Sequence, residues 1–241
     1  MKKSSFWNIL IYFIVYSVLG FLIETIYAIF TKGMLESRQS FLYGPFCIVY
    51  GIAAVILIVF LSKYKNKIIR LFAFGTILGC IVEYYSSLIG ELLLHVKWWD
   101  YSNDFFNING RTCLFYAICW GFLTIALINY INPVLDKIIN KIYEKLSIVL
   151  IKFTVVIITL FMTIDGLVTC YAIDNFLLRV ANEYNITING IENKEYNNIF
   201  SNEKMMMTYP NMIVVSDKNE NLYLESILKD VKNYYYKFSS M

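Results

Sequence analysis

The chain has 241 residues, of which 58% are hydrophobic on a count that includes Tyr, and only 16% are charged. Soluble domains carry about 25% charged residues and about 45–50% apolar ones. A globule of this length cannot bury so much apolar surface in one core. The composition therefore excludes a disordered chain and most cytosolic enzymes, and it favours an integral membrane protein.

Charge and cysteine usage exclude further classes. Residues 1–172 carry 14 Lys/Arg and 9 Asp/Glu, whereas residues 173–241 carry 7 and 9, for a net charge of +3 over the chain. Neither part has the dense basic patch of a nucleic-acid-binding protein. The five cysteines lie in apolar segments without a C-x-x-C pair, and His95 is the only histidine. We therefore expect no metal site, no disulfide framework, no cofactor and no nucleic-acid partner.

A helix that spans a bilayer needs about 20 mostly apolar residues. Five segments satisfy this requirement, at approximately residues 6–30, 44–62, 69–94, 111–132 and 148–172. The first follows two lysines, as a signal peptide would, but its apolar run is too long and lacks a small-x-small cleavage site. The sequence predicts an all-α membrane domain over residues 1–172 and a small polar C-terminal tail over 173–241.

Loop charges predict the orientation of the spans. With the N-terminus inside, ten Lys/Arg lie at cytoplasmic ends and four in the opposite loops, so the chain should have a cytoplasmic N-terminus and an extracytoplasmic tail. Within the tail, residues 182–202 resemble loop, 212–216 favour a short strand and 222–238 have helical spacing. Asn185 begins a glycosylation sequon, which matters only in a eukaryotic secretory setting.

An internal repeat links the first four predicted helices. GFLIE (20–24) in the first helix matches GCIVE (79–83) in the third, at an offset of 59 residues. GPFCIVY (44–50) opens the second helix and GRTCLFY (110–116) opens the fourth, at an offset of 66. The shared order predicts two copies of a two-helix hairpin, packed about a pseudo-two-fold axis along the membrane normal. The fifth helix lies outside the repeat.

The repeat places Glu24 and Glu83 at corresponding positions inside spans. A carboxylate in a bilayer costs several kcal/mol on insertion scales, so it normally faces protein or water. Each Glu lies four residues after a glycine, Gly20 or Gly79, and therefore shares a helix face with a site of close packing. We expect a substrate or proton site at these carboxylates, although a structural hydrogen bond is the alternative.

Asp165 is a third intramembrane carboxylate, in the fifth predicted helix. The three odd-numbered helices run in the same direction, so Glu24, Glu83 and Asp165 should lie at mid-depth or in the outer half. They could converge in one cavity and raise one another's pKa. A single interhelical hydrogen bond is the alternative for Asp165. Glu91, near a helix end, is expected to reach the interface.

Arg38 and Arg111 precede the second and fourth helices on the predicted outer side. The planar guanidinium suits carboxylate or phosphate. These residues could bind an anionic head group or neutralise the two Glu residues, or they could extend to lipid phosphate.

The second outer loop, WWDYSNDFFNINGR (98–111), is rich in aromatic and polar residues. Its Trp and Tyr side chains suit the headgroup region of a membrane. Asp100 and Asn107 are among its polar residues, and these provide more hydrogen-bonding capacity than an aromatic belt needs. We therefore expect a folded loop that caps a cavity, with Trp99, Asp100 and Asn107 near the substrate.

The sequence from about 6 to 172 resembles the putative ABC-transporter type IV family of small bacterial membrane proteins. The resemblance rests on GFLIETIY (20–27), R-x5-GPFCIVYG (38–51), IVEYYSSLIGELL (81–93), WWDYSNDFFNINGRTCL (98–114) and the Asp165 helix. It departs from the family pattern at Phe21, where Trp is frequent, and at Gln39, where Gly is frequent. The resemblance implies a multi-pass protein of the bacterial plasma membrane that is a transporter subunit.

Three functions remain open. The first is a permease-like component for an anionic or amphiphilic substrate, with Glu24, Arg38, Glu83, Arg111 and Asp165 in its polar site. The chain has no G-x-x-x-x-G-K-[ST] motif, so any ATPase would be a separate chain, and five helices suggest a homodimer. The second is an enzyme that acts on a lipid or isoprenoid with Glu24 or Glu83 as general acid/base. The third is a non-catalytic sensor or accessory subunit. We favour the first over an enzyme.

Overall fold

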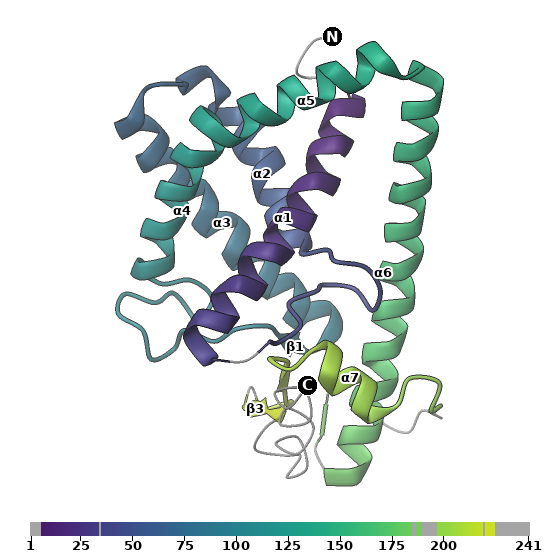
Figure 1. The fold of residues 1–241 in the computed structure, drawn as a ribbon. Coiled ribbons are helices and arrows are strands. Elements are labelled where there is room, and N and C mark those ends of the chain that lie inside the picture. The colour runs from purple at the N-terminus through teal and green to yellow at the C-terminus, as the bar shows by residue number, and fades with distance from the viewer. Residues whose placement is uncertain (1–5, 34, 185–186, 189–196, 219, 225–241) are drawn as a thin grey trace. The chain divides into compact units, whose positions relative to one another are not determined.

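The computed structural model describes residues 6–33, 35–184, 187–188, 197–218 and 220–224. Four helical stretches in this part are long and apolar enough to cross a membrane: Phe6–Lys32, Ile68–Leu94, Leu114–Lys145 and Ile148–Glu183. In their most apolar windows only 22–33% of the residues are buried in the protein, so most side chains there are available to lipid. The chain is therefore a mostly helical, multi-pass membrane protein in contact with a bilayer (Figure 1).

Helices α1 (Phe6–Lys32) and α3 (Ile68–Leu94) agree with the predicted first and third spans. The second span is shorter than predicted. Helix α2 (Ile48–Leu61) has 14 residues and a mean rise of about 1.5 Å per residue, which gives about 21 Å. It starts late because Gly44 has a positive φ of 75° and Cys47 is extended. A short 3-10 helix, η1 (Ser62–Tyr64), follows it.

The predicted fourth span is interrupted near its end. Helix α4 (Leu114–Ala126) passes into a π-helical turn, η2 (Leu127–Ile131), and then into α5 (Asn132–Lys145). Figure 1 shows α5 running transversely between α4 and the start of α6 (Ile148–Tyr184). The sequence predicted a loop here, because the charges in α5 end the apolar run.

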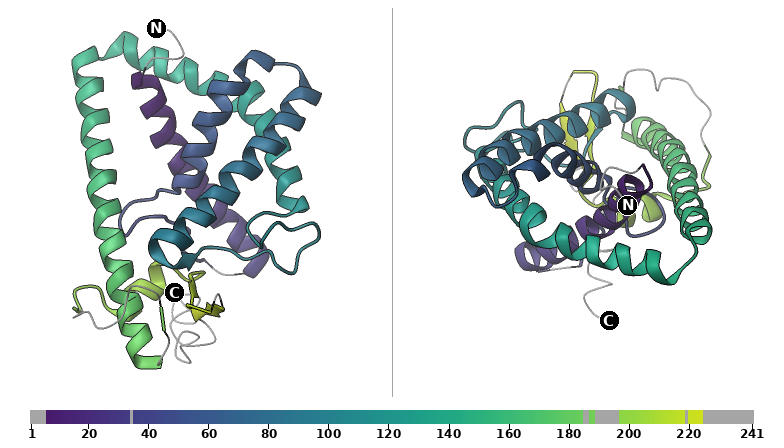
Figure 2. Two further views of the ribbon diagram at one scale, coloured as in Figure 1. Left: turned by 180° about the vertical axis from the view of Figure 1, so that it is seen from behind. Right: turned by 90° about the horizontal axis from the view of Figure 1, so that it is seen from above.

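The chain forms two compact units. The first comprises residues 1–20, 46–85 and 101–163, and the second comprises 21–45, 86–100 and 164–241. The core of the first unit joins α1, α2, α3, α4 and α5; its largest buried side chains include Tyr12, Leu57, Leu71 and Trp120. Figure 2 shows α2, α3 and α4 of this unit side by side.

Glycines bring α1 and α2 into close contact in the first unit. A Cβ atom at Gly20 would lie 2.3 Å from the Cβ atom of Tyr50, and one at Gly51 would lie 2.2 Å from the Ser17 Oγ atom. The backbone amide of Cys47, the residue before α2, also donates to the Ser17 carbonyl at 2.8 Å. The two helices can approach this closely only because neither glycine has a side chain.

Helices α3 and α4 make the same kind of contact. A Cβ atom at Gly79 would lie 2.4 Å from the Trp120 Cβ atom, and one at Gly121 would lie 2.6 Å from the Thr76 Oγ1 atom. Each pair of helices therefore joins one glycine to an aromatic residue and another glycine to a hydroxyl residue. The α3–α4 pair has a third contact of this kind, because a Cβ atom at Gly75 would lie 2.4 Å from the Thr124 Oγ1 atom.

The second unit has a core of large apolar side chains. Ile173, Phe176, Leu177 and Val180 follow helical spacing along the end of α6, and each is at most 1% exposed. They pack with buried residues of α7 (Asn202–Thr208) and of the sheet. This stripe explains why α6 extends to Tyr184, beyond the predicted limit at 172, although Asp174 and Arg179 interrupt the apolar run.

A small antiparallel sheet joins the tail to the segment after α3. Its strand order is β1 (Val96–Lys97), β2 (Ile213–Val215) and β3 (Asn221–Tyr223), with Val96 opposite Val214 and Val214 opposite Leu222. The predicted strand at 212–216 is therefore confirmed. Most of the predicted helix at 222–238, and two residues of the sequon that starts at Asn185, lie outside the described residues.

Candidate functional site

Glu83, one of the two predicted repeat carboxylates, lies at the centre of a buried polar cluster in the first unit. Its side chain is 6% exposed on α3. The Tyr101 hydroxyl donates to its Oε1 atom at 3.2 Å, and the Thr112 hydroxyl donates to its Oε2 atom at 2.8 Å. Both donors come from the loop before α4, so both carboxylate oxygens accept a hydrogen bond from the same loop.

Arg111 lies one residue before Thr112 and is 8% exposed. Its guanidinium carbon is 5.7 Å from the centre of the Tyr84 ring, a cation–π distance. The amide of Asn109 donates to the Tyr84 hydroxyl at 2.9 Å. The loop therefore places the Arg111 cation over Tyr84, the residue that follows Glu83 on α3.

Backbone geometry explains how the loop holds these groups. Asn109 and Gly110 both have positive φ, 52° and 66°, and together they form a turn that glycine and asparagine tolerate. The Asn107 amide donates to the carbonyls of Ser102 and Asp104 at 3.1 and 3.0 Å, and its oxygen accepts from the Gly110 amide at 3.1 Å. Asn107 thus binds its own loop and fixes the backbone just before Arg111. The loop is folded as predicted, whereas the cavity that it was expected to cap stays a prediction.

In the second unit, Asp165 anchors a different loop. It is 3% exposed on α6, and its Oδ2 atom accepts from the Tyr43 amide at 3.1 Å. One turn later, the Thr169 hydroxyl accepts from the Leu42 amide at 2.9 Å. Gly166 lies between them, and a Cβ atom there would be 3.2 Å from the Phe41 ring. Figure 1 shows the loop before α2 lying along α6.

Arg38 belongs to the same loop and contacts Glu36, a carboxylate outside the predicted set of site residues. Glu36 is 4% exposed, and its Oε2 atom lies 3.1 Å from the Arg38 Nη2 atom and 3.0 Å from the Lys32 Nζ atom. The Lys32 ammonium also donates to the Asn211 side chain at 2.9 Å. Arg38 therefore forms an ion pair within its loop.

Asp100 and Trp99 also lie in the second unit, where both are partly buried. The Oδ2 atom of Asp100 accepts from the Asn221 amide at 2.6 Å and from the Tyr223 hydroxyl at 3.0 Å. Burial, together with this hydrogen bond and the negative charge of Asp100, raises the pKa of Tyr223 above its usual value. Asp100 thus fastens the tail strand β3.

The structure brings together some of the predicted site residues. Glu83, Asn107 and Arg111 share the first unit; Arg38 and Asp165 share the second, with Glu24 half-buried on α1 and Trp99 and Asp100 after α3. Sequence reasoning missed Tyr101, Thr112 and Glu36. Tyr101 lies within the polar loop and Thr112 directly follows it. Both are ordinary hydroxyl residues, so only their contacts with Glu83 distinguish them.

Comparison with family models matches residues 11–170, 160 of the 241 residues, to the description Putative ABC-transporter type IV. The chain belongs to this family. In this member of the putative ABC-transporter type IV family, the matched region contains Glu83, Arg111 and Asp165, whereas residues 171–241 lie outside it. Searches of curated proteins and of solved structures find no match.

Proposed function

We propose that this protein is a permease-like component of a transporter, that it handles an anionic or amphiphilic substrate, and that a separate chain supplies the ATPase. Membership of the family supports a transport role. The observation that carries the proposal is the buried polar cluster of Glu83, Tyr101, Thr112 and Arg111. Ionisable groups inside a membrane are expensive and usually serve a substrate or ion pathway.

The chemistry of this cluster favours an anionic group on the substrate. The Arg111 guanidinium supplies the positive charge and a planar set of donors. Glu83 has both oxygens occupied by hydroxyl groups of the loop, so its role is to hold Tyr101 and Thr112 in place and to balance the charge of Arg111. A substrate anion would compete with Glu83 for these donors.

The other predicted binding residues remain part of the proposal with different roles. Glu24, Arg38, Asp165 and Trp99 belong to the second unit, and for each of them a substrate contact remains a proposal of its own. Asp100 and Asn107 make the hydrogen bonds described above to protein partners, and we assign them positioning roles.

We further propose that α1–α2 and α3–α4 are tandem repeats. The paired glycine contacts support this: Ser17 and Thr76, like Gly20 and Gly79, are 59 residues apart. Their partners on the second helix of each pair, Gly51 and Gly121, are 70 apart, as are Tyr50 and Trp120. This offset exceeds the motif offset of 66 by about one helical turn. The repeat makes Glu24 the counterpart of Glu83.

The orientation and the partner complete the proposal. We propose a bacterial plasma-membrane location with a cytoplasmic N-terminus, a domain division at residue 172 and an extracytoplasmic tail. Helix α5 then lies on the cytoplasmic side, where its exposed Lys137, Lys141 and Lys145 form a charged surface for an ATPase subunit. A homodimer would double the number of spans around the pathway.

The test is affinity purification of the tagged chain from its native membranes, followed by ATPase measurement in lipid nanodiscs. We expect an ATP-hydrolysing subunit to copurify, and we expect Arg111→Gln to reduce substrate-stimulated hydrolysis at least tenfold. Arg70→Gln, at an exposed arginine near the start of α3, is the matched control. Turnover of a lipid by the isolated chain, without an ATPase, would contradict the proposal and favour the membrane enzyme.

A further inference from the structure

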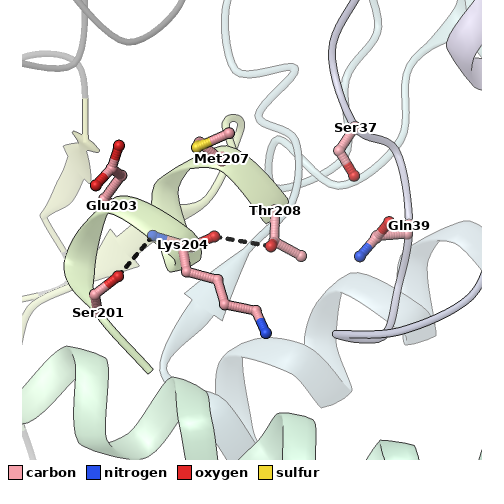
Figure 3. A pocket seen from close by; sticks show the side chains of 7 residues that line it. All are labelled: Ser37, Gln39, Ser201, Glu203, Lys204, Met207 and Thr208. Carbon is pink, nitrogen blue, oxygen red and sulfur yellow. Dashed lines mark hydrogen bonds between the residues drawn. The ribbon is translucent and has the colours of Figure 1, made fainter. Parts of the chain in front are cut away.

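A pocket of about 410 Å³ lies in the second unit. None of the residues that line it belongs to the Glu83 cluster. Its walls are the loop segment Ser37–Gln39 and helix α7. Ser37, Gln39, Ser201, Glu203, Lys204, Met207 and Thr208 line it (Figure 3). Pockets that bind small molecules have volumes of about 300–1,000 Å³, so this one can hold a small solute.

Both walls of the pocket are fixed by the rest of the unit. The loop is held on α6 through Asp165 and Thr169, as described above, and the Gln39 amide donates to the Leu42 carbonyl at 3.1 Å. Helix α7 buries Met205 and Met206 in the core, and Ser201 caps its first turn by accepting from the Lys204 amide at 3.2 Å. The pocket is therefore formed before any ligand arrives.

Lys204 provides a positive charge whose close contacts are uncharged. Its ammonium donates to the Tyr43 hydroxyl at 3.3 Å and lies 4.6 and 5.4 Å from the centres of the Tyr43 and Phe200 rings. Asp165 attracts it electrostatically, but no ion pair within 4.0 Å joins Lys204 to a carboxylate among the described residues. The ammonium thus retains hydrogen-bond donors for an anion.

Ser37 adds a second unused donor. Its hydroxyl oxygen is buried in the pocket wall and has no hydrogen-bond partner within the described residues. Buried polar atoms are normally hydrogen-bonded, so this hydroxyl is suited to a ligand atom. Thr208 already donates to the Lys204 carbonyl at 2.8 Å and can only accept.

The remaining walls restrict the ligand. Glu203 is an exposed carboxylate on the same helix, and Figure 3 shows its side chain pointing away from the Lys204 ammonium. A second negative charge on the ligand would be repelled by it. Met207 provides an apolar wall. We propose that the pocket binds a small soluble solute with one oxyanion group, held by Lys204 and Ser37. This proposal does not depend on the transport function or on the Glu83 cluster.

The test uses the full-length protein in nanodiscs of zwitterionic phosphatidylcholine and saturation-transfer NMR with three probes: lactate, glutamate and glycerol 3-phosphate. We expect saturation transfer to lactate, which carries one negative charge, and little or none to glutamate or glycerol 3-phosphate, because Glu203 would repel a second negative charge. Lys204→Met and Ser37→Ala should each weaken lactate binding about tenfold, the loss expected when a charged or buried donor is removed. Lys204→Arg should retain binding, and Lys218→Met, at an exposed lysine of the second unit outside the pocket, is the matched control.

Two controls decide between the outcomes. Thermal unfolding without probe identifies any variant that fails to fold. In that case the probe binding of the Lys204→Arg variant is compared with that of the unchanged protein. A second preparation contains phosphatidylglycerol: if its headgroup alone occupies the pocket and no soluble probe binds, the proposal is wrong. Binding that Lys204→Met and Ser37→Ala leave unchanged would also overturn it.

Discussion

The two compact units pack with different kinds of side chain. In the first unit, helices meet at glycines, with Gly79 on Trp120 and Gly51 on Ser17. In the second unit, large apolar side chains such as Phe176, Met205 and Val214 fill the core and are at most about 1% exposed. The two units share the long helices α1, α3 and α6, so the difference reflects where along each helix the contacts occur.

This difference follows from the solvent that each region replaces. Lipid is as apolar as a leucine side chain, so helices in a membrane gain little from burying large apolar groups and associate through close van der Waals contact and hydrogen bonds. In water, burial of large apolar groups supplies most of the free energy of folding. The core of the second unit has the large apolar side chains that are typical of water-soluble domains, although the ends of the membrane helices α1, α3 and α6 belong to this unit.

The largest effect on stability should come from removing a large side chain from the core of the second unit. Phe176→Ala should lower the free energy of unfolding by about 3–5 kcal/mol, because it removes a fully buried ring. Phe153→Ala, on the same helix at 61% exposure, should cost far less. Chemical unfolding of both variants in detergent micelles measures the difference. Equal losses would show that the two parts of α6 pack alike.

The next effect should come from filling the glycine contacts. Gly79→Ala should destabilise the first unit by about 1–3 kcal/mol, because the new methyl group overlaps the Trp120 side chain. Gly20→Ala should cost a similar amount if the two helix pairs are repeats. Ile77→Ala, at an exposed position of α3, serves as the control. A neutral Gly20→Ala beside a costly Gly79→Ala would contradict the repeat.

Alkaline pH should weaken the second unit. Burial of Tyr209, and secondarily the charge of Asp165, raises the pKa of its phenol above the unfolded value of about 10. Below about pH 10 the phenol is neutral in both states and its contribution to stability is fully present. Above that pH the phenol ionises in the unfolded chain first, so the free energy of unfolding falls by about 1.4 kcal/mol per pH unit. Fluorescence of Trp98, whose ring is 5.3 Å from that of Tyr209, reports unfolding. Tyr209→Phe should remove this part of the pH dependence, and an unchanged slope would refute it.

The smallest effects on stability should come from replacing the buried carboxylates Glu83 and Asp165 by amides, and the two replacements should differ. Glu83→Gln leaves one of the two hydroxyl donors without an acceptor, at a cost of about 1 kcal/mol. Asp165→Asn retains an oxygen for the Tyr43 amide and should cost less. Denaturant midpoints measured side by side at pH 7 would check the order. The reverse order would mean that the charge of Asp165 matters more than its hydrogen bond.

The sequence predicted the membrane character and most of the long helices because uninterrupted apolar runs of about 20 residues are typical of membrane spans. It failed where local backbone geometry or tertiary contacts decide the outcome. The late start of α2 depends on Gly44 and Cys47, and the extension of α6 depends on an apolar stripe that charged residues interrupt.

The candidate site was predicted only in part for a related reason. Glu83 and Asp165 were identifiable because charge is rare inside membrane spans, and Arg111 because it is a cation directly before a predicted span. Their partners were not: Tyr101 and Thr112 are common residue types, and the amides of Leu42 and Tyr43 belong to every residue's backbone. Lys204 lies in a tail that has no membrane signal, so the pocket beside it could be found only from the fold.

The π-helical turn η2 (Leu127–Ile131) has a consequence for the register of the chain. A π-turn accommodates one residue more than an α-turn, and each residue of an α-helix rotates the next by about 100°. Deleting one residue here would restore an unbroken α-helix and rotate α5 by about 100° around the helix axis. Asn132 and Asp136 would then face away from the Tyr16 and Tyr12 hydroxyls that now donate to them. The extra residue of this turn therefore determines which face of α5 is directed toward the tyrosines of α1.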